Sequence, residues 1–267
     1  MGKNIQGWLA AIIIPLAIVI AYFIYTQVLG NPANFEGGSN LNEPLKNNYL
    51  GVVYKGGSIV ILLISFQIIL VAYAIERFIS LRQARGKADN ARFVSQVKES
   101  FEQKETEGIV KACDTQQGSL ASVIKNGIKT YMMVDDDPDF DKESKLITIR
   151  NQFEESTQLE IPQLNKNMSI IATLASISTL IGLLGTVTGM IKAFSALARV
   201  GAPDAVGLAN GISQALVTTA LGISTAAVAI VVFNYFTARI DKITFAIDEA
   251  SFSILSSMKE GYMRKSA

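Results

Sequence analysis

Four long apolar runs, separated by polar segments, dominate the pattern along the chain. No charged residue occurs within 4–35, 56–75, 167–191 or 205–238. A helix rises about 1.5 Å per residue, so each run is long enough to cross a hydrocarbon core of about 30 Å. The pattern predicts an all-α polytopic membrane protein with four transmembrane helices.

The first apolar run has a competing interpretation as a cleaved signal peptide. The run from Trp8 to Gly30 is longer than a typical signal core, and the residues from Tyr25 to Val28 make a poor cleavage site. We therefore predict an uncleaved helix that is bent at Pro15. The proline leaves the carbonyl one turn earlier without a donor, and neighbouring helices or water molecules can supply one.

Lysine and arginine are distributed unevenly between the segments that join the runs. Residues 77–166 hold 14 of the 24, whereas residues 30–56 hold Lys46 and Lys55, and residues 197–208 hold Arg199 alone. Positive charge near helix ends stays in the cytoplasm. Both termini and the middle segment are therefore predicted to be cytoplasmic.

These observations divide the chain into eight predicted segments. They are an N-terminal transmembrane helix (1–30), an outer loop (31–57), a second transmembrane helix (58–76), a cytoplasmic helical domain (77–166), a third transmembrane helix (167–196), an outer turn (197–208), a fourth transmembrane helix (209–238) and a cytoplasmic C-terminal helix (239–267). Long helices are expected to extend into the cytoplasmic bundle. Residues 77–111 are predicted to continue the second helix, and the helix of 144–164 to run into the third, bent at Pro162.

The third and fourth runs are rich in small residues at helical spacing. One stripe is Ala175, Thr179, Gly182, Thr186, Gly189 and Ala193; the other is Ala215, Thr219, Gly222, Ala226 and Ala229. Small faces let membrane helices approach closely. The second run is rich in Ile, Leu and Val, as in a lipid-facing helix, and Glu76 and Arg77 at its end are expected to form a structural ion pair.

The threonines of these two runs allow two interpretations. Hydroxyls at Thr186, Thr188, Thr218, Thr219 and Thr225 are many for mid-membrane positions. They can donate to a carbonyl one turn earlier and do nothing more. They can also line a path for water.

Other site chemistries find little support in the sequence. The net charge is +1, there is no histidine, and a single cysteine, Cys113, excludes a disulfide framework. The acidic stretch 135–141 lacks the central glycine and terminal glutamate of an EF-hand and is expected to be a solvated turn. We predict no enzyme activity, no metal site and no cofactor.

The motifs GLLGTVTGMIKAF and GISQALVTTALGISTAAVAIVVFNYF resemble the paired signature of the ExbB/TolQ/MotA proton-channel family, and within it the ExbB and TolQ proteins most. IERFISLR at 75–82 adds a weaker match. The resemblance implies an ExbB-like subunit of the bacterial inner membrane, with outer segments that are periplasmic.

In that family a homopentamer encloses the membrane helices of ExbD-like subunits, each with one membrane aspartate, and proton flow energises TonB-like proteins in TonB-dependent transport. The resemblance assigns the pore threonines to Thr186 and Thr219, with Thr218 as a neighbour. Gln214 stands where many relatives carry a glutamate and is expected to line the proton pathway with these threonines. Helix packing is expected at Gly182, Gly185, Gly189, Gly211 and Gly222.

Alternatives remain at this point. A TolQ-like or gliding-type rotary stator fits the same signature. A non-conducting membrane scaffold needs only the small-residue hairpin. A membrane enzyme or transporter finds no nucleotide motif or acid/base cluster in its support. No charged residue lies deep in the four spans, so a proton path needs a water wire or a carboxylate from another chain.

Overall fold

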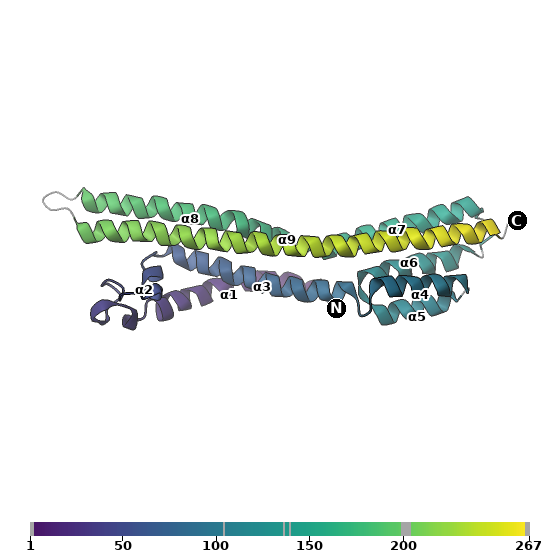
Figure 1. Cartoon of the computed structure of the whole chain (residues 1–267), viewed down its shortest axis with the longest axis horizontal. Helices are drawn as coiled ribbons and strands as arrows, with labels where there is room; N and C mark the ends of the chain where they lie inside the picture. The colour runs from purple at the N-terminus through teal and green to yellow at the C-terminus, as the bar shows by residue number, and fades with distance from the viewer. Residues whose placement is uncertain (1–2, 104, 136, 139, 199–203, 265–267) are drawn as a thin grey trace. The chain divides into compact units, whose positions relative to one another are not determined.

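The computed structural model describes residues 3–103, 105–135, 137–138, 140–198 and 204–264 (Figure 1). The chain is 86% helical, and four described helices are long and apolar enough to cross a membrane. The predicted all-α, polytopic membrane fold is thereby confirmed. The main α-helices, of 11 residues or more, are α1 (Lys3–Phe23), α3 (Ile59–Arg85), α4 (Asn90–Glu102), α5 (Thr106–Gln116), α6 (Gly118–Asp135), α7 (Lys142–Leu164), α8 (Met168–Leu197) and α9 (Ala205–Arg264).

The chain forms two compact units. Unit 1 combines the residues up to Ile75 with Met168–Phe233, and unit 2 combines Glu76–Asn167 with Asn234–Ala267. Both α3 and α9 contribute residues to both units. The apolar runs belong to unit 1 and most of the charged residues to unit 2.

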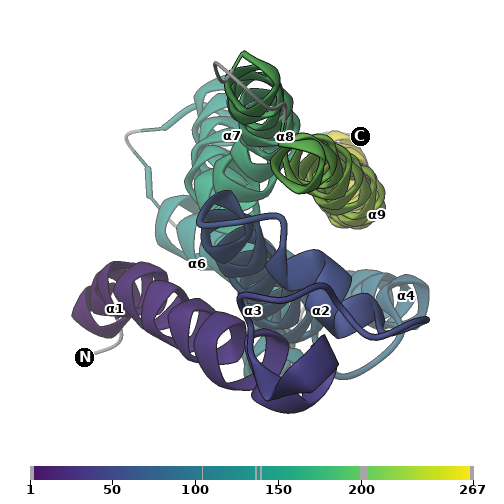
Figure 2. The ribbon, with the colours of Figure 1, turned by 90° about the vertical axis from the view of Figure 1, so that its left-hand side faces the viewer.

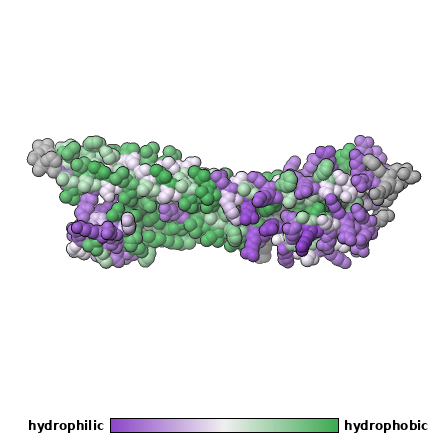
Figure 3. Space-filling model, in the orientation of Figure 1, coloured by the Kyte–Doolittle hydropathy of each residue, from purple (hydrophilic) through white to green (hydrophobic). Residues whose placement is uncertain are grey.

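Unit 1 is a bundle of α1, α3, α8 and the first part of α9. Viewed end-on, α8 and α9 lie side by side, and α3 lies between this pair and α1 (Figure 2). Hydrophobic side chains cover much of its surface, including Leu180, Leu216 and Val231, each more than 60% exposed (Figure 3). Such a surface is stable in lipid but not in water.

The polar segment between α1 and α3 is an ordered loop. A π-helical turn (Ile24–Leu29) extends α1, and short 3-10 turns (Pro32–Asn34 and Glu36–Gly38) and α2 (Tyr49–Tyr54) follow. Asn34 donates from Nδ2 to the carbonyls of Val28 and Leu29, and Asn48 accepts from two amides at the start of α2. These bonds satisfy helix ends that would otherwise lack partners.

Unit 2 is a helical bundle of α4 to α7 and the last part of α9. Its buried core includes Phe93, Ile109, Ile124, Ile149, Phe153, Ile247 and Ile254. α6 and α7 pack closely because Gly127 lies against the ring of Phe153, where a Cβ atom has no room. The end of α9 packs in this core, in agreement with the amphipathic pattern of the C-terminal segment.

The prediction that residues 77–111 continue the second membrane helix is wrong. α3 ends at Arg85, and Gly86 has a positive φ of 83°. A Cβ on Gly86 would lie 2.7 Å from the carbonyl oxygen of Gln117, so only glycine fits this helix-ending position. The Gln116 side chain then bonds both the amide and the carbonyl of Ala88 and fixes the turn.

The segment before α8 also differs from its prediction. Pro162 lies inside α7, and the helix is interrupted only after it, at Asn165 to Asn167, where Asn167 has a φ of 60°. α9, in contrast, is one continuous helix across the predicted boundary at 238/239. The predicted turn at 197–208 lies partly outside the described residues.

The single cysteine is buried in unit 2, and burial raises the pKa of the Cys113 thiol to about 12, with Asp114 acting in the same direction. Because only the thiolate reacts, we expect iodoacetamide at pH 8 to modify the folded protein more than about a hundredfold more slowly than the denatured chain. The raised pKa stabilises the fold fully below about pH 8.5, and this contribution is lost as the pH rises toward 12. Equal labelling rates would contradict the buried position.

Candidate functional site

Where α8 and α9 meet, the backbone atoms of the two helices pack directly against each other. The five glycines predicted to pack helices, Gly182, Gly185, Gly189, Gly211 and Gly222, are all buried in it. A Cβ on Gly222 would lie 2.8 Å from the Cα of Gly182 and 2.7 Å from the carbonyl oxygen of Ser178. At the other end of the contact, a Cβ on Gly211 would lie 2.6 Å from the amide nitrogen of Ala193.

Two of the predicted pore threonines lie in this contact. Thr218 is fully buried opposite Gly185, and its Oγ1 donates to the carbonyls of Gln214 (2.8 Å) and Ala215 (3.1 Å). Thr219 is half-buried and donates to the carbonyls of Ala215 (2.9 Å) and, across the contact, Gly182 (3.4 Å). With its donor engaged, the Thr219 hydroxyl oxygen still has lone pairs that can accept from water or a protonated carboxyl, whereas Thr218 has no exposed surface.

Thr186 lies beside the contact, not on it. The buried line of α8 passes through Ser178, Gly182, Gly185, Gly189, Ala193 and Ala196, whereas Thr179 is exposed and Thr186 half-buried. Thr186 donates to the carbonyl of Leu183 (2.6 Å) and borders an outer hollow of about 720 Å³ with Met190 and Phe194. The structure therefore brings Thr218, Thr219 and Gln214 together but leaves Thr186 on a neighbouring face.

Gln214 is buried, 6% exposed, and pairs with a lysine of the facing helix. Lys192 Nζ donates to Gln214 Oε1 at 2.8 Å, and Gly57, with a positive φ of 76°, packs against the same amide. Lys192 lies within α8, five residues before its end. Gln214 offers this cation a neutral acceptor, where a glutamate would form an ion pair.

A further polar contact joins α3 to α9 within unit 1. Gln67 Nε2 donates to Thr225 Oγ1 at 3.0 Å, and Thr225 donates in turn to the carbonyl of Leu221. From Gln214 to Thr225 the polar groups of α9 extend over about 16 Å of helix. Hydroxyls and amides, together with the Lys192 ammonium, therefore follow the interior of unit 1 over about half the thickness of a hydrocarbon core.

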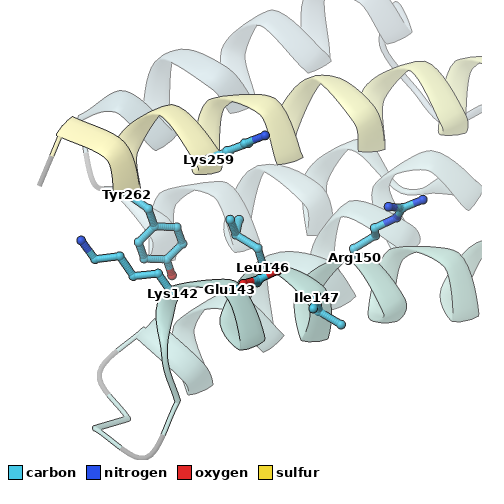
Figure 4. A pocket seen from close by; sticks show the side chains of 7 residues that line it. All are labelled: Lys142, Glu143, Leu146, Ile147, Arg150, Lys259 and Tyr262. Atoms are coloured by element: carbon cyan, nitrogen blue, oxygen red, sulfur yellow. The ribbon is translucent and has the colours of Figure 1, made fainter. Parts of the chain in front are cut away.

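Unit 2 contains a separate hollow of about 530 Å³ at the ends of α7 and α9 (Figure 4). The charged ends of Lys142, Arg150 and Lys259 are spread along it and do not point to a common centre. Tyr262 donates its hydroxyl to Asp135 at 2.8 Å. Among the described residues no group of three His, Cys, Asp or Glu side chains could hold a metal ion.

Comparison with known proteins places this geometry in a family. The model of the MotA/TolQ/ExbB proton channel family matches residues 115–249, half of the chain. The chain belongs to this family. The match contains α8, the first part of α9 and the whole contact between them. The family is one of proton channels and transport energisers, not a known class of enzyme.

The relatives carry two different names. The chain is 28% identical over 193 residues to the Tol-Pal system protein TolQ of Pseudomonas aeruginosa, which covers 69% of this chain and 81% of that protein. It is 37% identical over 89 residues to the putative biopolymer transport protein ExbB-like 3 of Synechocystis sp., over 33% of this chain and 42% of that protein. It is 34% identical over 94 residues to the biopolymer transport protein ExbB of Pseudomonas putida, over 34% of this chain and 29% of that protein.

The sequence pattern did not point to two residues of this site. Lys192 directly follows the uncharged run 167–191, and Gln67 lies in a run whose composition predicts a lipid-facing helix. A signal was present in both cases, because a lone polar residue within an apolar span usually faces the protein interior. Their partners, Gln214 and Thr225, became evident only with the register of the packed helices.

Proposed function

We propose that the chain is the ring-forming subunit of a proton-driven motor in the bacterial inner membrane, which transmits energy to an outer-membrane system. Membership of the MotA/TolQ/ExbB family is the observation that carries this proposal. ExbB-like and TolQ-like roles are both consistent with the relatives. The partners would be further copies of this chain in a pentamer, an ExbD-like single-span subunit and a TonB-like protein or its TolA-like counterpart.

The site itself offers no carboxylate to carry the proton, so we assign this role to a partner. No Asp or Glu lies between Glu160 and Asp204, or between Asp204 and Asp241, so neither α8 nor the membrane part of α9 holds a carboxylate. Thr219 supplies a hydroxyl oxygen, with the buried Thr218 beside it, and Thr186 supplies another on the neighbouring face of α8. We propose that these hydroxyls bond to a membrane aspartate of the partner, or to the water beside it.

Protonation of that aspartate would let the partner helix move past the ring. A charged carboxylate would accept from the water that these hydroxyl oxygens hold, and its neutral form could donate to a hydroxyl directly or face an apolar surface. Each proton that crosses 100 mV releases about 2.3 kcal/mol, so a few protons supply enough energy for a mechanical step. In this proposal both termini and unit 2 lie in the cytoplasm, as the distribution of Lys and Arg favours.

Removal of two pore hydroxyls tests the role of the threonines. We expect Thr186→Val with Thr219→Val to lower proton flux through the reconstituted complex by about tenfold or more, because the water that donates to the charged carboxylate would lose its acceptors, and a hydrogen bond to a charged group is worth about 1.5–3 kcal/mol. Valine has the shape of threonine, and both hydroxyls donate mainly within their own helices, so the fold should be retained.

The matched control removes one hydroxyl from each of the same two helices. Thr173 on α8 and Ser224 on α9 are exposed and donate to carbonyls of their own helix. Thr173→Val with Ser224→Ala should leave the flux unchanged. A double valine variant at 186 and 219 with normal flux would favour the non-conducting scaffold.

Co-purification in mild detergent with the products of neighbouring genes, followed by native mass spectrometry, tests the assembly. We expect a ring of identical subunits that holds a smaller single-span protein with a membrane aspartate. A stable homo-oligomer without such a partner would leave the chain without a titratable carboxylate in the membrane and would support the scaffold.

A further inference from the structure

We propose that a basic groove of unit 2 binds the headgroup of an anionic phospholipid. The groove lies between α3, the start of α4 and α9 and has a volume of about 660 Å³. Its charged and polar lining consists of Arg82, Arg85, Arg239, Lys242, Asp89 and Asn90. This proposal does not depend on proton coupling and requires only that the chain spans a membrane.

The charge of the groove favours an anion. Four of its lining side chains are cations, and none of them takes part in the ion pairs found among the described residues, which join Arg77 to Glu76, Lys125 to Asp114 and Arg150 to Glu154. One carboxylate, Asp89, opposes them. It already accepts from the amides of Ala91 and Arg92 at the start of α4. Arginine and lysine together are the side chains that hold phosphate groups best.

One polar atom of the groove lacks a partner within the described part of the chain. Asn90 Oδ1 is buried and accepts no hydrogen bond there. Since buried polar atoms are nearly always paired, this acceptor indicates a donor that the chain itself does not supply. Because the Asn90 side chain as a whole is only partly buried, a turn of its amide would present this oxygen to a headgroup hydroxyl or amine next to a phosphate.

The position of the groove along the chain indicates a lipid as the source of the phosphate. Arg239 is the first charged residue after the uncharged run 205–238, and Arg82 follows the uncharged run 56–75 by two turns of α3. Both walls therefore begin where apolar helix ends, which is the depth of phospholipid headgroups. Long basic side chains at this depth extend toward those headgroups.

The groove also offers apolar surface to the upper part of an acyl chain. Phe78 is 53% exposed and Tyr235 is 45% exposed, and both border the groove. The guanidinium of Arg239 lies 5.2 Å from the centre of the Tyr235 ring, a cation–π contact that holds one cation beside this apolar wall. A free phosphate ion would leave these rings exposed, whereas a phospholipid would cover them.

Thermal melting of the full-length protein in mild detergent tests the proposal. We expect added phosphatidylglycerol to raise the melting temperature saturably and phosphatidylcholine at the same concentration to have little effect. Arg239→Gln with Lys242→Gln should raise the half-saturating concentration of phosphatidylglycerol by about tenfold or more, since each basic side chain near an anionic surface contributes about fivefold in affinity.

The matched control removes two exposed cations of unit 2 outside the groove, with Lys111→Gln and Lys129→Gln. We expect it to retain the affinity of the unchanged protein. Three results would overturn the proposal: equal stabilisation by phosphatidylcholine, equal loss of affinity in the control, or the full shift with inorganic phosphate alone. The last would identify a free anion instead of a lipid as the ligand.

Discussion

Replacing Arg77 by leucine should destabilise the protein by about 3 kcal/mol, one of the two largest effects we expect of a single substitution. The Arg77 side chain is 1% exposed, and it donates to both carboxylate oxygens of Glu76 and to the carbonyl of Leu164 at 3.3 Å. Asn167 completes the cluster with a bond to Glu76 at 3.1 Å. Leucine would leave the carboxylate without its cation and the carbonyl without its donor. The estimate is at the low end for a broken buried pair because Glu76 is 27% exposed.

Chemical unfolding of the purified protein in detergent measures this effect. The control is Arg150→Leu, which breaks an exposed pair with Glu154 one turn away on α7 and should change stability by less than about 0.5 kcal/mol. Adding Glu76→Gln to Arg77→Leu should restore part of the loss, because the unpaired charge is removed. An Arg77→Leu protein as stable as the control would contradict the buried cluster.

Gly222→Val should separate α8 from α9 and destabilise unit 1 by about 3 kcal/mol, the upper end of the usual range for overpacking. The new Cβ would meet the Ser178 carbonyl oxygen and the Gly182 Cα at 2.7 and 2.8 Å. Both are backbone atoms, so no side chain can move aside and the helices themselves have to shift. Gly222→Ala should cause a smaller loss of the same kind.

The matched control is a helical glycine with free space around it. A Cβ on Gly261, near the end of α9, would meet nothing within 4 Å. Gly261→Ala should therefore be neutral or stabilise by up to about 1 kcal/mol, because alanine favours the helix. Thermal melting in detergent compares the variants directly. An unchanged melting temperature for Gly222→Val would show that the helices do not touch there.

Much of this fold is evident from the sequence because the membrane restricts the possible structures. Uncharged runs of this length have few alternatives to spanning helices, and the small residues indicate which two helices approach most closely. The helix break after Arg85 was missed, because it depends on Gly86 packing against Gln117 from a distant part of the chain. The composition changes at 238/239, but α9 continues through this position, as expected for a long helix that extends into the cytoplasmic bundle.

The candidate site was only partly evident for a similar reason. The spacing predicts both Thr219 and Thr186 on the small-residue faces. Thr186 lies beside the contact instead, because the buried line of α8 passes through Gly185 and Gly189. The predicted ion pair of Glu76 with Arg77 is present, but the sequence does not indicate that Arg77 is among the most buried side chains of unit 2. The pairing of Lys192 with Gln214 depends on the register between two helices, and the periodicity of each helix alone does not specify that register.

Proton flux into liposomes tests most directly whether the conducting unit needs a carboxylate from a partner. The chain would be reconstituted alone and together with its single-span partner, and a pH-sensitive dye would report flux under an imposed membrane potential. We predict flux only with the partner present and its loss when the partner's membrane aspartate is replaced by asparagine. Flux through the chain alone, or flux that survives the loss of that aspartate, would contradict the account.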